Sequence, residues 1–389
     1  MKSLAVTNKC IGAILLVGSI APAAAADNVE LYGIIDSGVQ YLGTRKHLSD
    51  KTTVRNTVSV KSGVYKGSRW GIKGSEGLGS GYSVNFVLES GFSSDDGKQA
   101  FSRLFGRQST ISLAGPFGEL MLGRMGALAS GAGPFALAGW FSPFGTSCGD
   151  YSVTANNYMF GFKRFDNTFA YKTPAFQNWQ LFLQYSRDTD TLEDIDPVTE
   201  GVQHGEEGRS NTSHYYGVGT RFKDKTKEFS VMFERLSYAR QVSGFRPTSA
   251  TSVTLGGSYL LSGWQLFTGL QYFRNGTSKL MKSIDKVWGD KGYKDGESIV
   301  GGLNIPALNS SVLVAMGYSH YKPSRGAANG QTKGYRYGGS IGYLYPVSKR
   351  TTLYALLNYA RDVQRYRTEH MNKGKSSTIE SSIGIAHSF

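Results

Sequence analysis

IESSIGIAHSF, residues 379–389, ends the chain and decides its fold class. Read back from the C-terminus, alternate positions are apolar or nearly so: Phe389, His387, Ile385, Ile383, Ser381 and Ile379. The positions between them are small or polar. Strict alternation indicates a β-strand that meets a different environment on each face. Because chain ends usually fray in water, a final aromatic residue favours a strand that closes a barrel in lipid.

The composition agrees with a membrane barrel and excludes a helical membrane protein. The chain has 389 residues, and no apolar run after residue 26 approaches the roughly 20 residues that a spanning helix needs. It contains 50 Gly, 23 Tyr and 21 Phe but only 10 Pro. Frequent glycine and aromatic residues suit a tightly packed sheet with aromatic girdles, in which only alternate residues face lipid.

The first 26 residues have the pattern of a secretory signal peptide. Lys2 and Lys9 precede or flank an apolar stretch at 11–20, and three alanines at 24–26 form a small-residue cleavage site. We therefore expect a signal peptide at 1–26 and a barrel domain at 27–389.

Cleavage of the signal peptide would leave a single cysteine. Cys10 lies inside the signal segment, so Cys148 would be the only cysteine of the mature chain. An intramolecular disulfide is then impossible. A reactive thiol is the alternative to a small loop residue, and the absence of a partner motif favours the loop residue.

Alternating segments recur along the rest of the chain. They are clearest at 29–42, 179–186, 263–272 and 351–359, where apolar residues alternate with Gln, Asn, Thr and acidic residues. In water, such strands could line the core of a sandwich. Strand after strand ends in Tyr or Trp, however, which favours the aromatic girdle of a membrane barrel.

The joins between these segments come in two lengths that alternate. Seven short, turn-like joins lie near 77–81, 114–118, 174–178, 223–227, 261–263, 306–310 and 346–349. Eight long polar joins lie near 43–67, 92–103, 125–163, 187–213, 236–251, 273–297, 319–334 and 360–377.

Fifteen joins connect sixteen strands, and one miscounted hairpin would give fourteen or eighteen. The fold class predicted is all-β: a transmembrane antiparallel barrel with short periplasmic turns, long external loops and an aqueous channel. Both chain ends then lie on the short-turn side, and the last strand pairs with the first near 29–41.

Five stretches resemble the general trimeric porins of Gram-negative bacteria, of the type found in Neisseria, Bordetella and Burkholderia. They are VELYGIIDSGVQY (29–41), SRWGIKGSEGLGSGYSVNFVLESGF (68–92), LFGRQSTISLAGPFGELMLGR (104–124), RFDNTFAYKTPAF (164–176) and IGIAHSF (383–389). The resemblance implies a homotrimer of sixteen-stranded barrels in outer-membrane lipid. It also implies a third external loop folded into the lumen, and a role for Phe389 as the signal read by the barrel-assembly machinery.

The third loop, about 125–163, departs from the family pattern. The family usually places several acids there, facing a wall of arginines, whereas Asp150 is the only acid at 125–162 of this chain. The loop is otherwise rich in glycine and aromatic residues. We therefore expect a weaker transverse field at the constriction.

Strand parity and the resemblance together select the pore-lining residues. By parity, Asp36, Arg69, Lys73 and Glu89 point inward. By resemblance, the wall arginines are Arg107, Arg124 and Arg164, with Asp150 on the loop.

The placement of Arg107 conflicts with simple parity. Arg107 shares a face with Ile111 and Leu113, so its inward placement needs a bulge or another register. An alternative is that the wall arginines only pair with loop acids. A mid-strand arginine facing lipid would cost about 2–4 kcal/mol, which favours the lumen.

These residues predict a passive, weakly anion-preferring channel for small hydrophilic solutes and ions. A substrate-specific channel, for which the loop aromatics would form a track, or an adhesin-like barrel are the alternatives. The acids at 188–207 and the basic residues near 221–227 and 361–375 are interpreted as solvated surface.

Other classes of function find no support in the sequence. No Ser/His/acid arrangement supports an enzyme, and no spacing of ligands supports a metal or cofactor site. The Gly-rich segment 74–81 lacks the ending of a phosphate-binding loop, and no basic patch motif supports nucleic-acid binding.

Overall fold

The fold is described from a computed structural model. The structure describes residues 28–48, 51–131, 133–187, 212–237, 249–277, 293–324, 331–368 and 371–389. The predicted signal peptide and the acids at 188–207 lie outside these ranges. None of the helices in the described ranges is long and apolar enough to cross a membrane.

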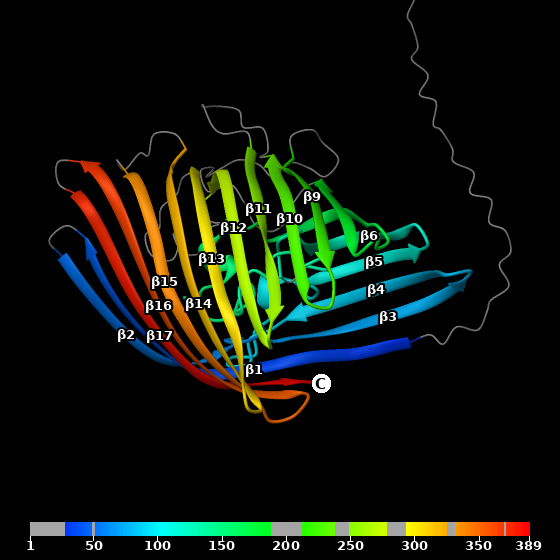
Figure 1. Ribbon diagram of the computed structural model, residues 1–389, viewed down its shortest axis with the longest axis horizontal. Helices are drawn as coiled ribbons and strands as arrows, with labels where there is room; N and C mark the ends of the chain where they lie inside the picture. Colours follow the sequence, from blue (N-terminus) through cyan, green and yellow to red (C-terminus); the bar gives the residue numbers. More distant parts are fainter. Residues whose placement is uncertain are drawn as a thin grey trace, which may run out of the picture.

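Antiparallel strands form one closed sheet, in which consecutive strands pair except that β2 and β3 both pair with β1 (Figure 1). The strands are β1 (Asn28–Leu48), β2 (Lys51–Ser62), β3 (Arg69–Gly79), β4 (Tyr82–Gly91), β5 (Gln108–Gly115), β6 (Gly118–Gly126), β7 (Arg164–Lys172), β8 (Trp179–Arg187), β9 (His214–Lys223), β10 (Lys227–Ser237), β11 (Ser249–Leu261), β12 (Trp264–Thr277), β13 (Tyr293–Ala307), β14 (Ser310–Pro323), β15 (Gln331–Pro346), β16 (Thr351–Thr368) and β17 (Met371–Ser388). The described ranges also contain two short helices, the 3₁₀ turn η1 (Ala100–Ser102) and α1 (Ala155–Tyr158).

The second wall strand is divided into two pieces. β2 pairs with residues 37–48 of β1, and β3 pairs with residues 28–34 of the same strand. The two pieces therefore share one position, and the barrel has sixteen strands, as predicted. Asp36 organises the interruption, because its carboxylate accepts the backbone N–H groups of Tyr65 at 3.0 Å and Lys66 at 2.6 Å.

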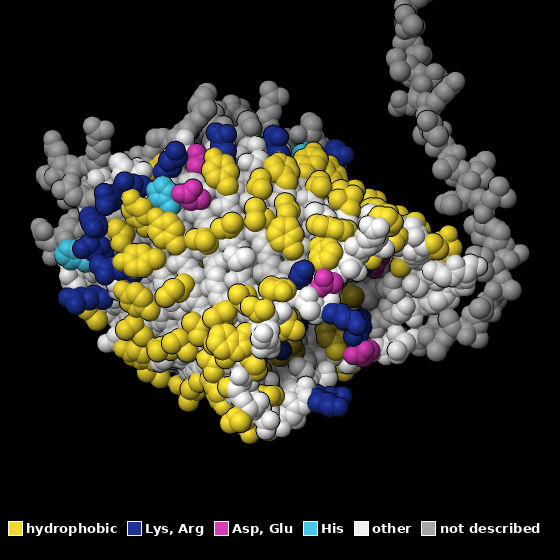
Figure 2. All heavy atoms as spheres, in the orientation of Figure 1, with side chains coloured by type: hydrophobic (Ala, Val, Ile, Leu, Met, Phe, Trp, Pro, Cys, Tyr) yellow, Lys and Arg dark blue, Asp and Glu magenta, His cyan; other side chains and the backbone are white. Residues whose placement is uncertain are grey.

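The two faces of each strand meet different surroundings, as the alternation predicts. In β17, the exposed fractions of Ile379, Ile383 and Ile385 are 48%, 64% and 45%, whereas Glu380 and Ser382 are buried. The exposed side chains give the outside of the barrel an apolar surface, seen on the face in Figure 2. The polar positions therefore face the interior.

The last strand closes the barrel against the first, which confirms the predicted pairing. The register runs from Ile34 opposite Ser388 to Leu48 opposite Gly374. Phe389 exchanges two backbone hydrogen bonds with Gly33, both 3.1 Å long. A Cβ on Gly33 would lie 2.3 Å from the ring of Phe389, so the absence of a side chain there makes room for the terminal aromatic ring.

The turns agree with the prediction, whereas two of the long joins are much shorter than expected. Each of the seven short joins is a turn between consecutive strands. The joins expected at 43–67 and 360–377, by contrast, are mostly strand. There the strands continue beyond the apolar surface, where both faces are polar and the hydrophobic alternation that marks a strand is lost.

Candidate pore and constriction

The third loop, here residues 127–163, packs its apolar side chains against the inner wall. Phe141 and Phe144 are buried, together with wall residues that include Met232 and Leu356. Glycines in the wall make this packing possible: a Cβ on Gly256 or Gly269 would lie 2.8 Å from Phe141. The apolar composition that separates this loop from the family pattern thus serves its docking to the barrel.

Inward-facing polar side chains from several wall strands form hydrogen bonds with the backbone of the loop and fix its position. In β12, the Gln271 amide accepts the Phe160 N–H and donates to the Phe160 carbonyl, both at 2.7 Å. The other anchors are Gln184 to Gly126 at 2.9 Å, Ser230 to Leu137 at 2.7 Å, Ser319 to Tyr158 at 2.8 Å and Val153 to Ser340 at 2.8 Å. These contacts satisfy loop groups that would otherwise be buried unpaired.

Glu380 in β17 holds the tip of the loop. Its carboxylate accepts the backbone N–H groups of Asp150, at 3.0 and 3.2 Å, and of Tyr151, at 2.8 Å. The amides of Gln40, at 2.6 Å, and Asn358, at 3.1 Å, also donate to it. A fully buried carboxylate with four donor groups is a strong anchor, because hydrogen bonds to a charged group are stronger than neutral ones.

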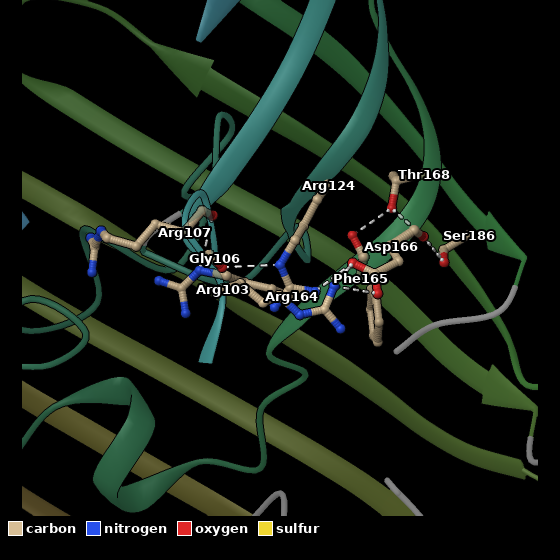
Figure 3. A network of polar contacts seen from close by, with 9 residues as sticks. All are labelled: Arg103, Gly106, Arg107, Arg124, Arg164, Phe165, Asp166, Thr168 and Ser186. Carbon is tan, nitrogen blue, oxygen red and sulfur yellow. Dashed lines mark hydrogen bonds and ion pairs between the residues drawn. The ribbon is translucent and has the colours of Figure 1, made fainter. Parts of the chain in front are cut away.

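Five arginines come together on the wall formed by β3 to β7. They are Arg69, Arg103, Arg107, Arg124 and Arg164. Figure 3 shows the side chains of Arg103, Arg124 and Arg164 converging near Asp166, with Arg107 beside them. We call this group the arginine cluster.

Asp166 in β7 neutralises one side of the arginine cluster. Arg124 donates to it at 2.6 Å, and Arg103 donates to both of its oxygens at 3.0 and 2.9 Å. The backbone carbonyl of Asp166 accepts the hydroxyls of Thr168 and Ser186, which fixes this part of β7 (Figure 3).

Glu89 in β4 neutralises the other side. Arg107 donates to it at 2.5 Å, Arg69 lies 3.4 Å away, and the hydroxyl of Tyr32 donates at 3.0 Å. The parity conflict at Arg107 has a simple solution: β5 begins one residue later, at Gln108, so Arg107 need not share a face with Ile111. No bulge is required.

Arg164 and Arg124 also bind the backbone that leads into β5. Arg164 donates to the carbonyl of Arg107 at 3.1 Å, and Arg124 donates to the carbonyl of Gly106 at 3.0 Å. The arginines therefore hold the segment that carries Arg103 and Arg107. Arg107 and Arg124 pair with the strand acids Glu89 and Asp166, whereas the alternative expects them to pair with loop acids.

Three predicted pore residues lie apart from the arginine cluster. Lys73 pairs with Glu30 at 3.1 Å, and both side chains are about half exposed. Asp150 at the loop tip contacts the ammonium group of Lys61. The structure thus brings Arg69, Glu89 and the three wall arginines into one cluster, and leaves Lys73, Asp150 and Asp36 outside it.

Two residues of the site, Arg103 and Asp166, are not among those that the sequence predicted. Arg103 follows η1 in an external connection, where residue alternation carries no information. Asp166 lies two residues after Arg164, and an Arg-x-Asp pair at the start of a strand was the available signal. Four of the five guanidinium groups form ion pairs with the two carboxylates Glu89 and Asp166, and the five positive charges against these two negative charges leave the arginine cluster with a net positive charge.

Cys148 lies buried in the third loop, with an exposed fraction of 3%. Burial raises the pKa of its thiol, and the nearby Glu380 and Asp36 carboxylates raise it further. We expect its alkylation at pH 8 to be at least about tenfold slower in the folded barrel than in the unfolded chain, because only the thiolate reacts. Mass spectrometry of iodoacetamide-treated protein measures this, and rapid labelling of the folded barrel would contradict the buried position.

In the part of the chain that the structure describes, no group of three His, Cys, Asp or Glu side chains is placed to hold a metal ion.

The aromatic residues of the third loop are mostly buried against the wall. Phe135, Phe141, Phe144 and Phe160 are between 0% and 4% exposed. They therefore do not form a track along the pore.

Comparison with known proteins agrees with this geometry. A family model for Gram-negative porins matches residues 12–364. The chain belongs to the Gram-negative porin family. An outer membrane porin of Bordetella pertussis is 30% identical over 97% of this chain and 99% of its own length. Outer membrane porin protein 32 of Delftia acidovorans is 26% identical over 98% of this chain and 99% of its own length.

Solved structures show the same fold. The anion-selective porin from Comamonas acidovorans superimposes with a TM-score of 0.66 at 23% identity, covering 93% of this chain and all of that one. The porin described here is thus a passive channel of the bacterial outer membrane, as the sequence analysis predicted.

Proposed function

We propose that this porin passes small hydrophilic solutes and ions with a weak preference for anions. The excess of guanidinium over carboxylate groups in the arginine cluster is the observation that carries the proposal. A pore discriminates by radius, lining charge and hydration, and a positive lining raises the local concentration of anions. The porin from Comamonas acidovorans is described as anion-selective, which supports the same direction.

The reversal potential of a single channel in a KCl gradient tests the preference for anions. The expected result is a potential displaced toward the equilibrium potential of chloride at low salt. The displacement should shrink toward 1 M KCl, where the screening length falls to about 3 Å. A potential displaced toward potassium would contradict the proposal.

A catalytic role is not supported. His320 lies 3.6 Å from Glu297, and His387 contacts the hydroxyl of Thr351 at 2.9 Å. Both are on strands at opposite ends of the barrel, and neither orients a buried nucleophile. We infer that this porin transports without chemistry.

We also infer that the porin is a homotrimer. One structural neighbour, OmpT of Vibrio cholerae, is named as a trimer form, and the family resemblance of the sequence points the same way. Electrophoresis of unheated and heated samples in detergent tests this: a large species should convert to a monomer on heating. A single monomeric band in both samples would count against it.

The C-terminal Phe389 is proposed as the signal read by the barrel-assembly machinery. Its ring lies over Gly33 and its backbone pairs with the first strand, so Phe389 lies where the last strand meets the first. Deletion of Phe389 is expected to lower the amount of barrel in the outer membrane several-fold. Quantitative immunoblotting of membrane fractions measures the amount, and conductance of the channels that do assemble should be unchanged. Normal assembly with impaired conduction would refute the assignment.

A further inference from the structure

One aromatic ring of the third loop is open to the lumen. Within the described part of this loop, Trp140 is 38% exposed, whereas every other aromatic side chain is at most 8% exposed. The next residue, Phe141, is fully buried against the wall. The packing of the loop therefore uses the neighbouring ring and leaves the indole available to a passing solute.

The segment that carries Trp140 is held against β8 and β10. The ring of Phe135 lies 5.1 Å from the ring of Phe182 in β8. The carbonyl of Leu137 accepts the hydroxyl of Ser230 in β10 at 2.7 Å. Because both contacts lie within five residues of Trp140, they fix the position of the indole beside the inward-facing side chains of these strands.

Two cations of β9 lie beside this segment. The ammonium group of Lys223 lies 5.2 Å from the centre of the Trp140 ring, and the Lys223 side chain is 53% exposed. The guanidinium carbon of Arg221 lies 5.2 Å from the centre of the Phe182 ring. Both residues share strand parity with the buried Gly219, so both side chains point into the lumen.

A single carboxylate pairs with both cations. Glu228 in β10 lies 2.8 Å from Lys223 and 3.7 Å from Arg221. Nε of Arg221 has no hydrogen-bond partner among the described residues. Two cations against one carboxylate leave one net positive charge beside the exposed indole. We call this group the indole subsite; its members are Trp140, Arg221, Lys223 and Glu228.

The indole subsite lies toward the periplasmic end of the lumen. β9 ends at Lys223 and is joined to β10 by a short turn. In outer-membrane barrels the short turns lie on the periplasmic side. The arginine cluster lies elsewhere, on the wall formed by β3 to β7. A solute that crosses the channel therefore meets two separate positive groups, and the indole subsite is the one with an exposed ring.

We propose that the indole subsite binds solutes that carry both an aromatic ring and a carboxylate. The ring of the solute packs against the exposed part of the Trp140 indole, and its carboxylate accepts from Lys223. An ammonium group has three N–H donors, so Lys223 can bind a second carboxylate while it keeps Glu228. Arg221 is held by Gln180, to which it donates at 3.0 Å, and adds positive charge. The inference rests on the proposed function, because only a channel that admits anions brings such solutes to the subsite.

Block of the single-channel current in planar bilayers tests the proposal, with benzoate, acetate and benzamide as probes. Benzoate carries a ring and a charge, acetate carries only the charge, and benzamide carries only the ring. The half-blocking concentration of benzoate should be about two- to tenfold lower than that of acetate, the range expected for an aromatic pair. It should also be about fourfold lower than that of benzamide, the factor expected for a unit charge about 5 Å from the ammonium group in water.

Two variants and a matched control separate the contribution of the ring from that of the charge. Trp140→Leu should raise the half-blocking concentration of benzoate to about that of acetate and leave the acetate value within about twofold. Lys223→Gln should raise both values about fourfold. The control, Lys172→Gln, removes an inward lysine at the same end of the lumen that pairs with Glu119 at 2.8 Å. It should change either value by less than about twofold, because that charge is already paired.

Equal block by benzoate and acetate in the wild type would overturn the indole subsite, and so would an unchanged ratio of the two in Trp140→Leu. Either result, with a reversal potential that still shows preference for chloride, would leave the proposed function standing without the subsite. A reversal potential displaced toward potassium would contradict the proposed function itself. The KCl conductance of each variant shows that a folded channel has formed, and the comparison of probes in the wild type requires no variant.

Discussion

Replacing Glu380 by alanine is expected to raise the single-channel conductance and to add gating noise. The substitution removes the acceptor for the N–H groups of Asp150 and Tyr151 at the tip of the third loop. Hydrogen bonds to a charged group contribute about 1.5–3 kcal/mol each, so loss of two makes detachment of the tip measurable. A detached tip leaves more of the lumen open. Planar-bilayer recordings in 1 M KCl measure both the mean conductance and its fluctuation.

A change of charge alone is separated from release of the loop by a matched variant. Glu228 is also a buried, inward-facing carboxylate, and it forms ion pairs with Arg221 and Lys223, which lie outside the third loop. Glu228→Ala should leave the noise unchanged. If both variants raised conductance and noise equally, the anchoring role of Glu380 would be refuted.

Opposite charge changes in the arginine cluster are expected to shift ion preference in opposite directions. Arg107→Gln or Arg124→Gln removes one positive charge, whereas Glu89→Gln or Asp166→Asn removes one negative charge. A unit charge about 5 Å from a passing ion in water is worth about 0.8 kcal/mol, or about fourfold for one ion. Chloride and potassium respond in opposite directions, so the ratio of their permeabilities should fall up to about sixteenfold for the arginine variants and rise up to about sixteenfold for the acid variants. Reversal potentials at 0.1 M mean salt measure it.

Lys73 provides the control for these variants. It is half exposed, pairs with Glu30 and lies outside the arginine cluster. Lys73→Gln should change the permeability ratio by less than about twofold. A shift as large as that of Arg124→Gln would mean that net charge of the whole barrel, rather than the cluster, sets the preference.

Sequence patterns predicted the parts of this porin that depend on local periodicity. Alternation along 379–389 and the turn residues between strands identified a barrel, its strand number and its closure, because a strand between lipid and water must alternate. The pattern failed above the membrane. There the outward positions of β16 and β17 carry Arg365, Lys373 and Lys375, so that no apolar face marks the strands.

The contacts that shape the pore could not be predicted from local patterns, because they join distant segments. In the sequence, Gln271 is one of several polar residues in an alternating strand. Only the fold shows that its amide forms two hydrogen bonds with the backbone of Phe160. The pairing of Arg103 with Asp166 likewise spans 63 residues and begins in a connection without periodicity. Parity can assign a side chain to the lumen, but it cannot assign its partner.

The bond between Asp150 and Glu380 has a consequence for the order of folding. Its two residues are 230 positions apart, so the loop tip cannot reach its final acceptor until almost the whole chain has been supplied. Contacts of such long range carry a large loop-closure entropy and form late. Insertion of the last strand therefore both seals the wall and sets the bore of the channel. A barrel that has not closed lacks the Glu380 carboxylate that fixes the constriction. The final pore size is therefore reached only after the last strand has been inserted.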